Sequence, residues 1–152
     1  MKTLILGLGN TILSDDGVGI KVVQELKKRL KPESGIDVVG GGIAGIALLD
    51  EIAGYDKLVL IDSIKTGKSE PGTLHKLTPE DFDTAEHLTY SHGVNFSTIV
   101  KFGEKLGYKM PGVIDVYAIE IEDNTTFGEK LTPQVDEKIS SIVEEIETCL
   151  QR

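Results

Sequence analysis

The residues of this 152-residue chain that are best suited to chemistry are three aspartates and one histidine. Asp15 and Asp16 follow an apolar run and a Gly-x-Gly-Asn turn near the N-terminus. Asp62 follows another apolar run, and His92 lies in a Ser-His-Gly segment. Carboxylates and an imidazole form a ligand set suited to a first-row divalent ion such as nickel, zinc or iron. Such an ion with open positions can polarise a carbonyl group or activate a water molecule.

Each of these residues also has a purely structural interpretation. Asp15 and Asp16 can be N-caps and dipole partners of the helix that follows them. Alternatively, one of the two caps the helix while the other faces a pocket. Asp62 can form a turn through its own backbone. His92 can lie in the first turn of a helix without binding a ligand.

Other residues are weaker candidates for a functional site. His75 lies within an expected short strand, and His87 lies in an acidic segment. The glycines at 40–42 and Gly45 can mark tight turns or allow a substrate backbone to approach closely. Cys149 falls on the apolar stripe of the last helix, where a small core residue is expected.

Composition limits the class of protein and its partners. The formal net charge of −9 argues against nucleic acid or an anionic membrane surface as the main partner. One cysteine excludes an internal disulfide and favours a reducing cytoplasm. No apolar run approaches the ~20 residues of a membrane span, and the N-terminal run breaks at Gly7 without a cleavage-site pattern. We therefore expect a cytoplasmic protein in which this run is a core strand.

The apolar pattern predicts alternating strands and helices. Strands are expected at 2–7, 36–39, 57–61, 73–77 and 113–119. Helices are expected at 17–30, at 44–52, after an N-cap at Thr78, around Phe96–Leu106 with Leu106 on the inner face, and from Pro133 onward with Thr132 as the N-cap. The order at the start, β-α-β-α-β, implies a parallel sheet with right-handed crossovers. We predict an α/β fold: a three-layer α/β/α sandwich around about five mostly parallel strands, of the phosphorylase/hydrolase-like kind.

This fold would bring the chemical residues together, because ligands of open parallel sheets bind outside the carboxyl ends of the strands. Asp16, Asp62 and His92 are expected at that edge. The first turn differs from a dinucleotide fingerprint, since Ile12 stands where a third glycine is needed. The acidic pair would also repel a pyrophosphate. A carboxylate site is therefore favoured over a nucleotide pocket.

Four blocks of sequence, taken in order, resemble the hydrogenase maturation endopeptidases across essentially the whole chain. The blocks are Gly7-Leu8-Gly9-Asn10 with Asp15-Asp16-Gly17-Val18-Gly19, Gly41-Gly42-Ile43-Ala44-Gly45 with Leu48-Leu49, Ile61-Asp62-Ser63, and Ser91-His92. The resemblance implies one domain over residues 1–152 that removes the C-terminal extension of a nickel-iron hydrogenase large-subunit precursor after nickel insertion.

The resemblance also implies which residues act. The metal-contacting and catalytic positions of the family match Asp16, Asp62 and His92. The nickel is supplied by the substrate, so the resting protein does not necessarily bind it. The implied partner is the large-subunit precursor. No nucleic acid or membrane is expected as a partner, and the protein is expected to be a monomer. Asp16 stands where the family often has the longer glutamate, and Glu120 is not followed by the proline that the family often has.

Other functions and mechanisms remain open at this stage. The two aspartates can act without metal, as paired carboxylates that share a proton. A non-catalytic nickel-binding maturation chaperone would use the same ligands. A peptidyl-tRNA hydrolase-like esterase also opens with a Gly-Leu-Gly-Asn turn, but such an enzyme expects a basic face for RNA, and this chain is acidic.

Overall fold

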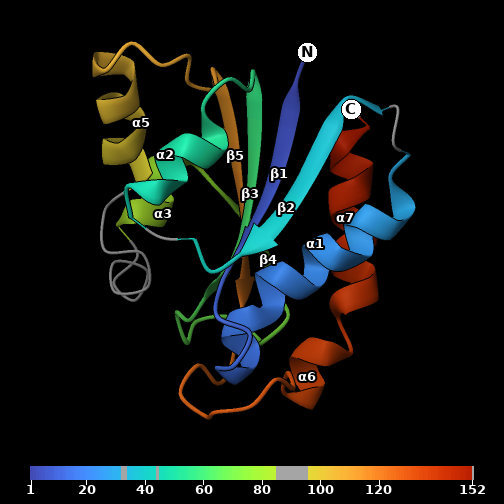
Figure 1. The fold of residues 1–152 in the computed structure, drawn as a ribbon. Coiled ribbons are helices and arrows are strands. Elements are labelled where there is room, and N and C mark those ends of the chain that lie inside the picture. Colours follow the sequence, from blue (N-terminus) through green and yellow to red (C-terminus); the bar gives the residue numbers. More distant parts are fainter. Residues whose placement is uncertain (32–33, 44, 85–95, 152) are drawn as a thin grey trace.

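A mostly parallel sheet lies between two layers of helices (Figure 1). The computed structural model describes residues 1–31, 34–43, 45–84 and 96–151. In these residues, five strands pair in the order β2-β1-β3-β5-β4. They are β1 (Thr3–Leu8), β2 (Ile36–Gly41), β3 (Lys57–Ile64), β4 (Leu74–Leu77) and β5 (Val113–Glu120). The edge strand β4 is antiparallel to β5 and the other pairings are parallel, which confirms the predicted α/β architecture.

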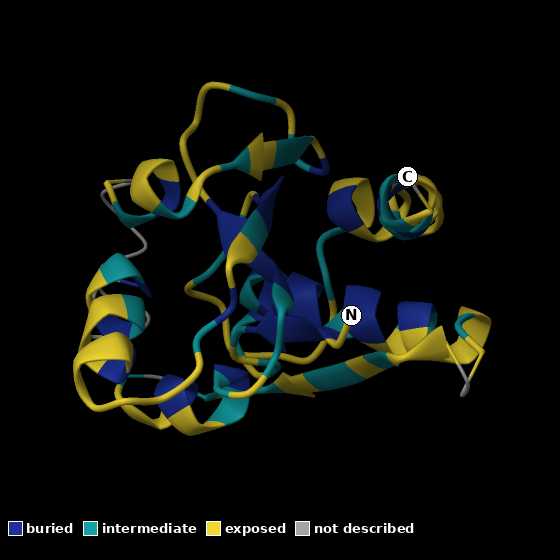
Figure 2. Ribbon diagram, turned by 90° about the horizontal axis from the view of Figure 1, so that it is seen from above, coloured by how far each residue is buried: buried dark blue, intermediate teal, exposed yellow. Residues whose placement is uncertain are grey.

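Each face of the sheet is covered by its own set of helices. One set is α2 (Ala47–Ile52), α3 (Pro79–Asp83) and α5 (Phe96–Lys105); the other is α1 (Val18–Arg29), α6 (Pro133–Asp136) and α7 (Ile139–Leu150). The buried sides of the helices face the strands in Figure 2. No helix in the described part of the chain is long and apolar enough to cross a membrane.

Alternation along the strands decides which face each side chain joins. In β3, Leu58, Leu60 and Ile64 pack under α2, α3 and α5, whereas Val59 and Ile61 pack under α1. Because successive side chains of a strand point to opposite faces, Asp62 belongs to the α2–α3–α5 face and Ser63 to the α1 face. The same rule puts Glu120 of β5 on the face of Asp62.

Strands β3 and β5 extend into polar residues beyond their predicted ends, and β1 and β2 also end one and two residues later than predicted. The expected end of the third strand at residue 61 is wrong, because β3 pairs with β5 as far as Ile64 opposite Glu120. Asp62 therefore lies within a strand, two residues before its end, and is not in a turn. Both strands continue through polar residues because backbone hydrogen bonds do not depend on side-chain polarity.

Helix boundaries were predicted less accurately than helix positions. The expected single C-terminal helix is wrong: α6 ends at Asp136 and α7 begins at Ile139, although the apolar stripe continues across the break. Leu106 was expected on the inner face of a helix, but it follows the end of α5 and is exposed. Thr78 is confirmed as an N-cap, since its side chain accepts a hydrogen bond from the Asp81 N–H at 3.1 Å.

Candidate functional site

The Gly9-Asn10 turn folds directly onto Asp16. Gly9 has φ +147°, and a Cβ at this position would overlap the Asp16 carbonyl oxygen. The Asn10 N–H donates to Asp16 Oδ2 at 3.0 Å. Asp16 lies in a short 3₁₀ helix (η1, Ser14–Gly17) and is half-buried. The turn therefore holds one oxygen of the Asp16 carboxylate from the backbone.

Gly19 seats the first helix on the ends of two strands. A Cβ at Gly19 would lie 2.6 Å from the carbonyl oxygens of both Leu8 and Ile61. These residues belong to β1 and β3, which are neighbours in the sheet. The close approach brings η1, just before α1, to the carboxyl ends of these strands (Figure 1).

Ser63 connects the two aspartates that the sequence selected. Its hydroxyl donates to Asp16 Oδ1 at 3.0 Å, and its backbone N–H donates to Asp62 Oδ1 at 2.7 Å. Asp62 is 1% exposed. The two carboxylates thus meet Ser63 from opposite faces of the sheet edge. The sequence prediction included Ser63 only as part of the Ile61-Asp62-Ser63 block and assigned it no role. Strand alternation alone would have placed its side chain toward α1.

Asp15 is a structural residue rather than a cap of α1. It is fully buried, and its carboxylate accepts hydrogen bonds from the backbone N–H groups of Glu122, Asp123 and Thr132 at 2.7–3.1 Å. The Thr132 hydroxyl adds a contact of 2.8 Å. The caps of η1 and α1 involve no side-chain hydrogen bond, which corrects the N-cap interpretation. Asp15 instead attaches the segment after β5 to η1.

Thr132, which donates to Asp15, lies at the start of α6. It occupies the expected N-cap position of α6, and Pro133 opens the helix as predicted. Its side chain does not cap the helix, because the hydroxyl donates to Asp15 instead. The connection between η1 and α6 thus takes precedence over the local cap.

His92 lies outside the described residues, as do His87 and the rest of 85–95, so its predicted position is an open expectation. The residues on either side are firmly connected. Asp83 at the end of α3 accepts hydrogen bonds from the N–H groups of Phe96 and Ser97 at 2.7 and 2.8 Å. Both α3 and α5 cover the face of Asp62. Within the described ranges, no group of three His, Cys, Asp or Glu side chains is arranged to hold a metal ion.

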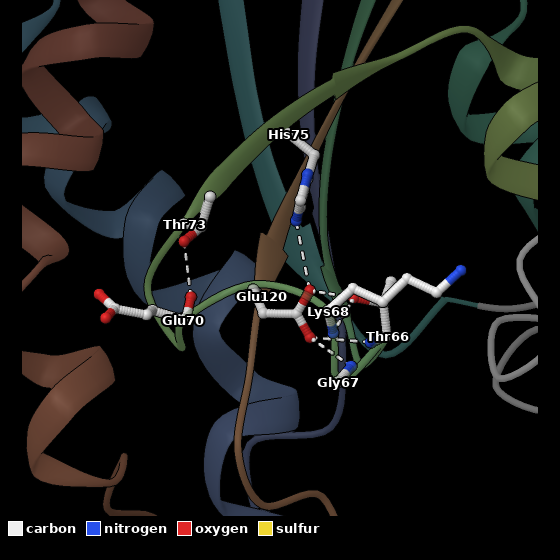
Figure 3. Close-up of polar contacts among 7 residues, drawn as sticks. All are labelled: Thr66, Gly67, Lys68, Glu70, Thr73, His75 and Glu120. Carbon is white, nitrogen blue, oxygen red and sulfur yellow. Dashed lines mark hydrogen bonds and ion pairs between the residues drawn. The ribbon is translucent and has the colours of Figure 1, made fainter.

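Glu120 forms a second polar cluster near the end of β5 (Figure 3). Its buried carboxylate accepts hydrogen bonds from the Thr66 hydroxyl at 2.6 Å and the Thr66 N–H at 2.8 Å. The Gly67 N–H and His75 Nε2 each lie 3.3 Å away. The Glu120 backbone pairs with Gly72 and Thr73, so one residue holds both ends of the loop between β3 and β4.

This cluster keeps Glu120 ionised. Burial alone would raise the pKa of the Glu120 carboxyl, but hydrogen bonds from Thr66, Gly67 and His75 outweigh it and lower the pKa below its ordinary value. An ionised carboxylate can only accept, so His75 Nε2 carries the proton that it donates. His75 lies in β4 as predicted, and both His75 and Asp62 pair with Ala118, from opposite sides. Sequence analysis missed the Glu120 cluster.

The arrangement around Asp16 suits a carboxylate that binds an external group. Within the described part of the chain, one of its oxygens accepts a hydrogen bond from Asn10 and the other from Ser63, and a carboxylate oxygen has two lone pairs. Such fixed orientation is the support that ligating carboxylates need. Asp16 therefore keeps acceptor capacity on its oxygens for an external group.

Comparisons of the sequence with known proteins agree with one another. A family model described as HycI, hydrogenase maturation protease, matches residues 20–149. The hydrogenase expression/formation protein HupD of Thiocapsa roseopersicina is 30% identical over 148 residues, 94% of this chain and 65% of HupD. The hydrogenase 2 maturation protease of Escherichia coli strain K12 is 36% identical over 81 residues, 53% of this chain and 49% of that protein. The chain spans less than two thirds of each of these relatives.

Solved structures share the fold. The hydrogenase maturating endopeptidase HybD from Escherichia coli has a TM-score of 0.81 and 26% identity, with 99% of this chain and 93% of that chain covered. The [NiFe] hydrogenase maturation protease HycI from Thermococcus kodakarensis has a TM-score of 0.74 at 20% identity, covering 99% and 93%. Asp62 and His92 fall within the residues matched by the family model, whereas Asp16 precedes them.

Proposed function

This chain belongs to the hydrogenase maturation protease family, and on this premise we propose that it is an endopeptidase that removes the C-terminal extension of a nickel-iron hydrogenase large-subunit precursor. The observation that carries the proposal is the connection of Asp16 and Asp62 through Ser63 at the carboxyl edge of the sheet. Ligands of open parallel sheets bind at this edge.

In this proposal the nickel is part of the substrate. Asp16, Asp62 and His92 contact the nickel of the precursor and thereby place the scissile bond in register. Asp16 is prepared for this role by the backbone N–H and the hydroxyl that orient its two oxygens. The precursor supplies the nickel in this proposal, so the resting protein does not need to bind a metal ion of its own.

The reaction is a hydrolysis of one peptide bond. A water oxygen attacks the scissile carbonyl carbon, the C–N bond breaks, and the leaving nitrogen takes a proton. The substrate nickel polarises the carbonyl or the water, which lowers the barrier to attack. Asp16 or Asp62 accepts the proton of the attacking water and returns it to the leaving amine.

The proposal includes the setting of the reaction. The protein acts in the cytoplasm, as a monomer with a single domain, on a protein substrate. Its net charge of −9 and its single cysteine support a cytoplasmic protein that binds neither nucleic acid nor membranes.

The test is the intact mass of purified large-subunit precursor, with and without nickel, after incubation with this protein. We expect loss of a short C-terminal peptide from the nickel-containing precursor only. His92→Ala should abolish cleavage, whereas His87→Ala in the same segment should leave it intact and serves as the matched control.

Other outcomes separate the alternatives. Cleavage of nickel-free precursor that is lost in Asp62→Asn would favour a metal-independent carboxylate pair. Stable binding of the nickel-containing precursor without any mass change would favour a nickel-binding chaperone. Equal cleavage by wild type and His92→Ala would exclude His92 as a ligand needed for the reaction.

A further inference from the structure

Two large apolar side chains lie uncovered beside the candidate site. Ile12 is 50% exposed and Phe127 is 80% exposed. A parallel bridge between Leu13 and Gly128 brings their segments together. The Gly128 N–H donates to the Ile12 carbonyl at 2.8 Å, and the Ser14 N–H donates to the Gly128 carbonyl at 2.9 Å. These hydrogen bonds place the backbone of Ile12 beside that of Gly128, so the two exposed apolar residues lie on neighbouring segments. We call the pair the Ile12–Phe127 patch.

The segments that carry the patch are firmly anchored. Besides the bridge, the Ser14 hydroxyl donates to the Lys130 carbonyl at 3.1 Å. Asp15 binds the segment on both sides of Phe127, through Glu122 and Asp123 before it and Thr132 after it. A surface ordered in advance loses little conformational entropy when it binds a partner. The patch is therefore exposed on an anchored segment and not on a loose terminus.

The patch is continuous with the Asp16 site. The Asn10 side chain accepts a hydrogen bond from the Ile12 N–H at 3.1 Å, while the Asn10 N–H donates to Asp16. One turn thus carries both the carboxylate and half of the patch. An extended chain that passes Asp16 can reach the patch within a few residues, since each extended residue spans about 3.3 Å.

The surroundings of the patch are acidic. Residues 121–130 contain Glu122, Asp123 and Glu129 but only one basic residue, Lys130. Hydrogen bonds from Thr126 and Thr125 lower the pKa of Asp123 below its ordinary value, so its charge persists in mild acid. An anionic lipid surface would be repelled here, whereas a segment with basic side chains is attracted.

We propose that the Ile12–Phe127 patch binds the C-terminal extension of the precursor next to the scissile bond, through an apolar side chain flanked by basic ones. This inference rests on the proposed function and assigns a specificity subsite to it. An apolar contact at the centre with charges around it is the usual anatomy of a protein recognition site.

The test measures precursor cleavage by Phe127→Ser and Ile12→Ser, with Leu106→Ser as the matched control. Leu106 is 56% exposed, and the segment after it pairs with the residues that precede β3, at the opposite end of the sheet. We expect each patch variant to raise KM about tenfold with kcat retained, and the control to change neither. Glu129→Gln should raise KM at low salt. The control variant Glu104→Gln on α5 should leave KM unchanged.

Binding gives a second readout. The precursor and its mature form, which lacks the extension, are titrated against the Asp62→Asn protein with and without Phe127→Ser. Phe127→Ser should weaken binding of the precursor about tenfold and leave binding of the mature form unchanged.

The outcomes distinguish this inference from the proposed function. Normal cleavage by wild type with an unchanged KM in Phe127→Ser overturns the patch assignment and leaves the protease intact. Absence of cleavage by wild type overturns the proposed function, and the binding titration then decides the patch. Self-association of wild type that disappears in Phe127→Ser would assign the patch to a second copy of the chain and overturn the inference.

Discussion

The hydroxyl of Ser63 lies 3.0 Å from Oδ1 of Asp16, although 47 residues separate them in the chain. The contact joins the strand of Asp62 to the short helix of Asp16. It helps to fix the direction of a half-buried carboxylate, because among the described residues Asn10 holds Oδ2 and Ser63 holds Oδ1. The geometry of the candidate site therefore depends on a residue that has no metal-binding chemistry of its own.

Ser63→Ala tests this dependence. Removal of the hydroxyl should lower kcat for precursor cleavage about tenfold, because the Asp16 carboxylate loses its orientation. The free energy of unfolding should fall by about 1 kcal/mol, the usual value of one hydrogen bond. Ser140→Ala, an exposed change on α7, is the control for both measurements. An unchanged kcat in Ser63→Ala would show that Asp16 is oriented without it.

Gly19→Ala should disturb the packing of α1. The new methyl group would meet two backbone carbonyls at 2.6 Å, which cannot move aside as a flexible side chain does. We expect a loss of about 2 kcal/mol or more in the free energy of unfolding, typical of overpacking, and a reduced rate of cleavage. Urea unfolding measures the first effect. At Gly112, an added Cβ meets nothing within 4 Å, so Gly112→Ala should be nearly neutral.

Asp15→Asn should separate stability from catalysis. The amide retains one acceptor oxygen but faces N–H donors with its NH₂ group, leaving buried donors unpaired. We expect the free energy of unfolding to fall by about 3 kcal/mol, as for a buried hydrogen bond to a charged group. Asp16→Asn should lose cleavage with a much smaller change in stability. Exposed Asp50→Asn on α2 is the neutral control for thermal unfolding.

The lowered pKa of Glu120 predicts a specific pH dependence of the free energy of unfolding. Its pKa in the folded protein is below its ordinary value, so ionisation favours the folded state. That contribution is complete above the unfolded pKa, near 4.5, and is lost as the pH falls through the lower folded pKa. Glu120→Gln should therefore destabilise the protein at pH 7, and its difference from wild type should shrink in acid.

Urea titrations between pH 7 and pH 3 would measure this difference. Glu104→Gln, an exposed change on α5, should show a small difference that does not vary over the same range. A constant difference between wild type and Glu120→Gln at every pH would mean that Glu120 acts through hydrogen bonding alone.

The sequence was sufficient to predict the architecture, and the reason is visible in β1 and β3. Both are apolar runs buried on two faces, a pattern that only a central parallel strand requires. The end of β3 was not predictable from polarity, because its last residues are held by pairing with β5. The break between α6 and α7 was missed because the apolar stripe of the last helix is continuous across it.

The candidate site was predicted in part. The turn at Gly9 and the position of Asp16 followed from residue types, since a glycine turn before a helix is a local pattern. The partners of Asp15 could not be found in this way. They are backbone N–H groups 107–117 residues away, and every non-proline residue carries such a group. Sequence patterns record side chains and do not reveal which distant backbone a carboxylate will bind.

The Asp15 anchor has a consequence for how this protein can diverge. Because it holds the segment after β5 mainly through backbone groups, the anchor itself does not depend on the exposed side chains between Asp123 and Thr132. Gly128 with φ +157° and the core-packed Leu131 are constrained, but mutations at exposed positions such as Phe127 can accumulate without loss of the path of the segment. Selection could exchange residues such as Phe127 to follow a changing substrate while the carboxylates stay in place. The exposed residues of this segment can thus change with the substrate, whereas Asp15 and the carboxylates of the candidate site must stay.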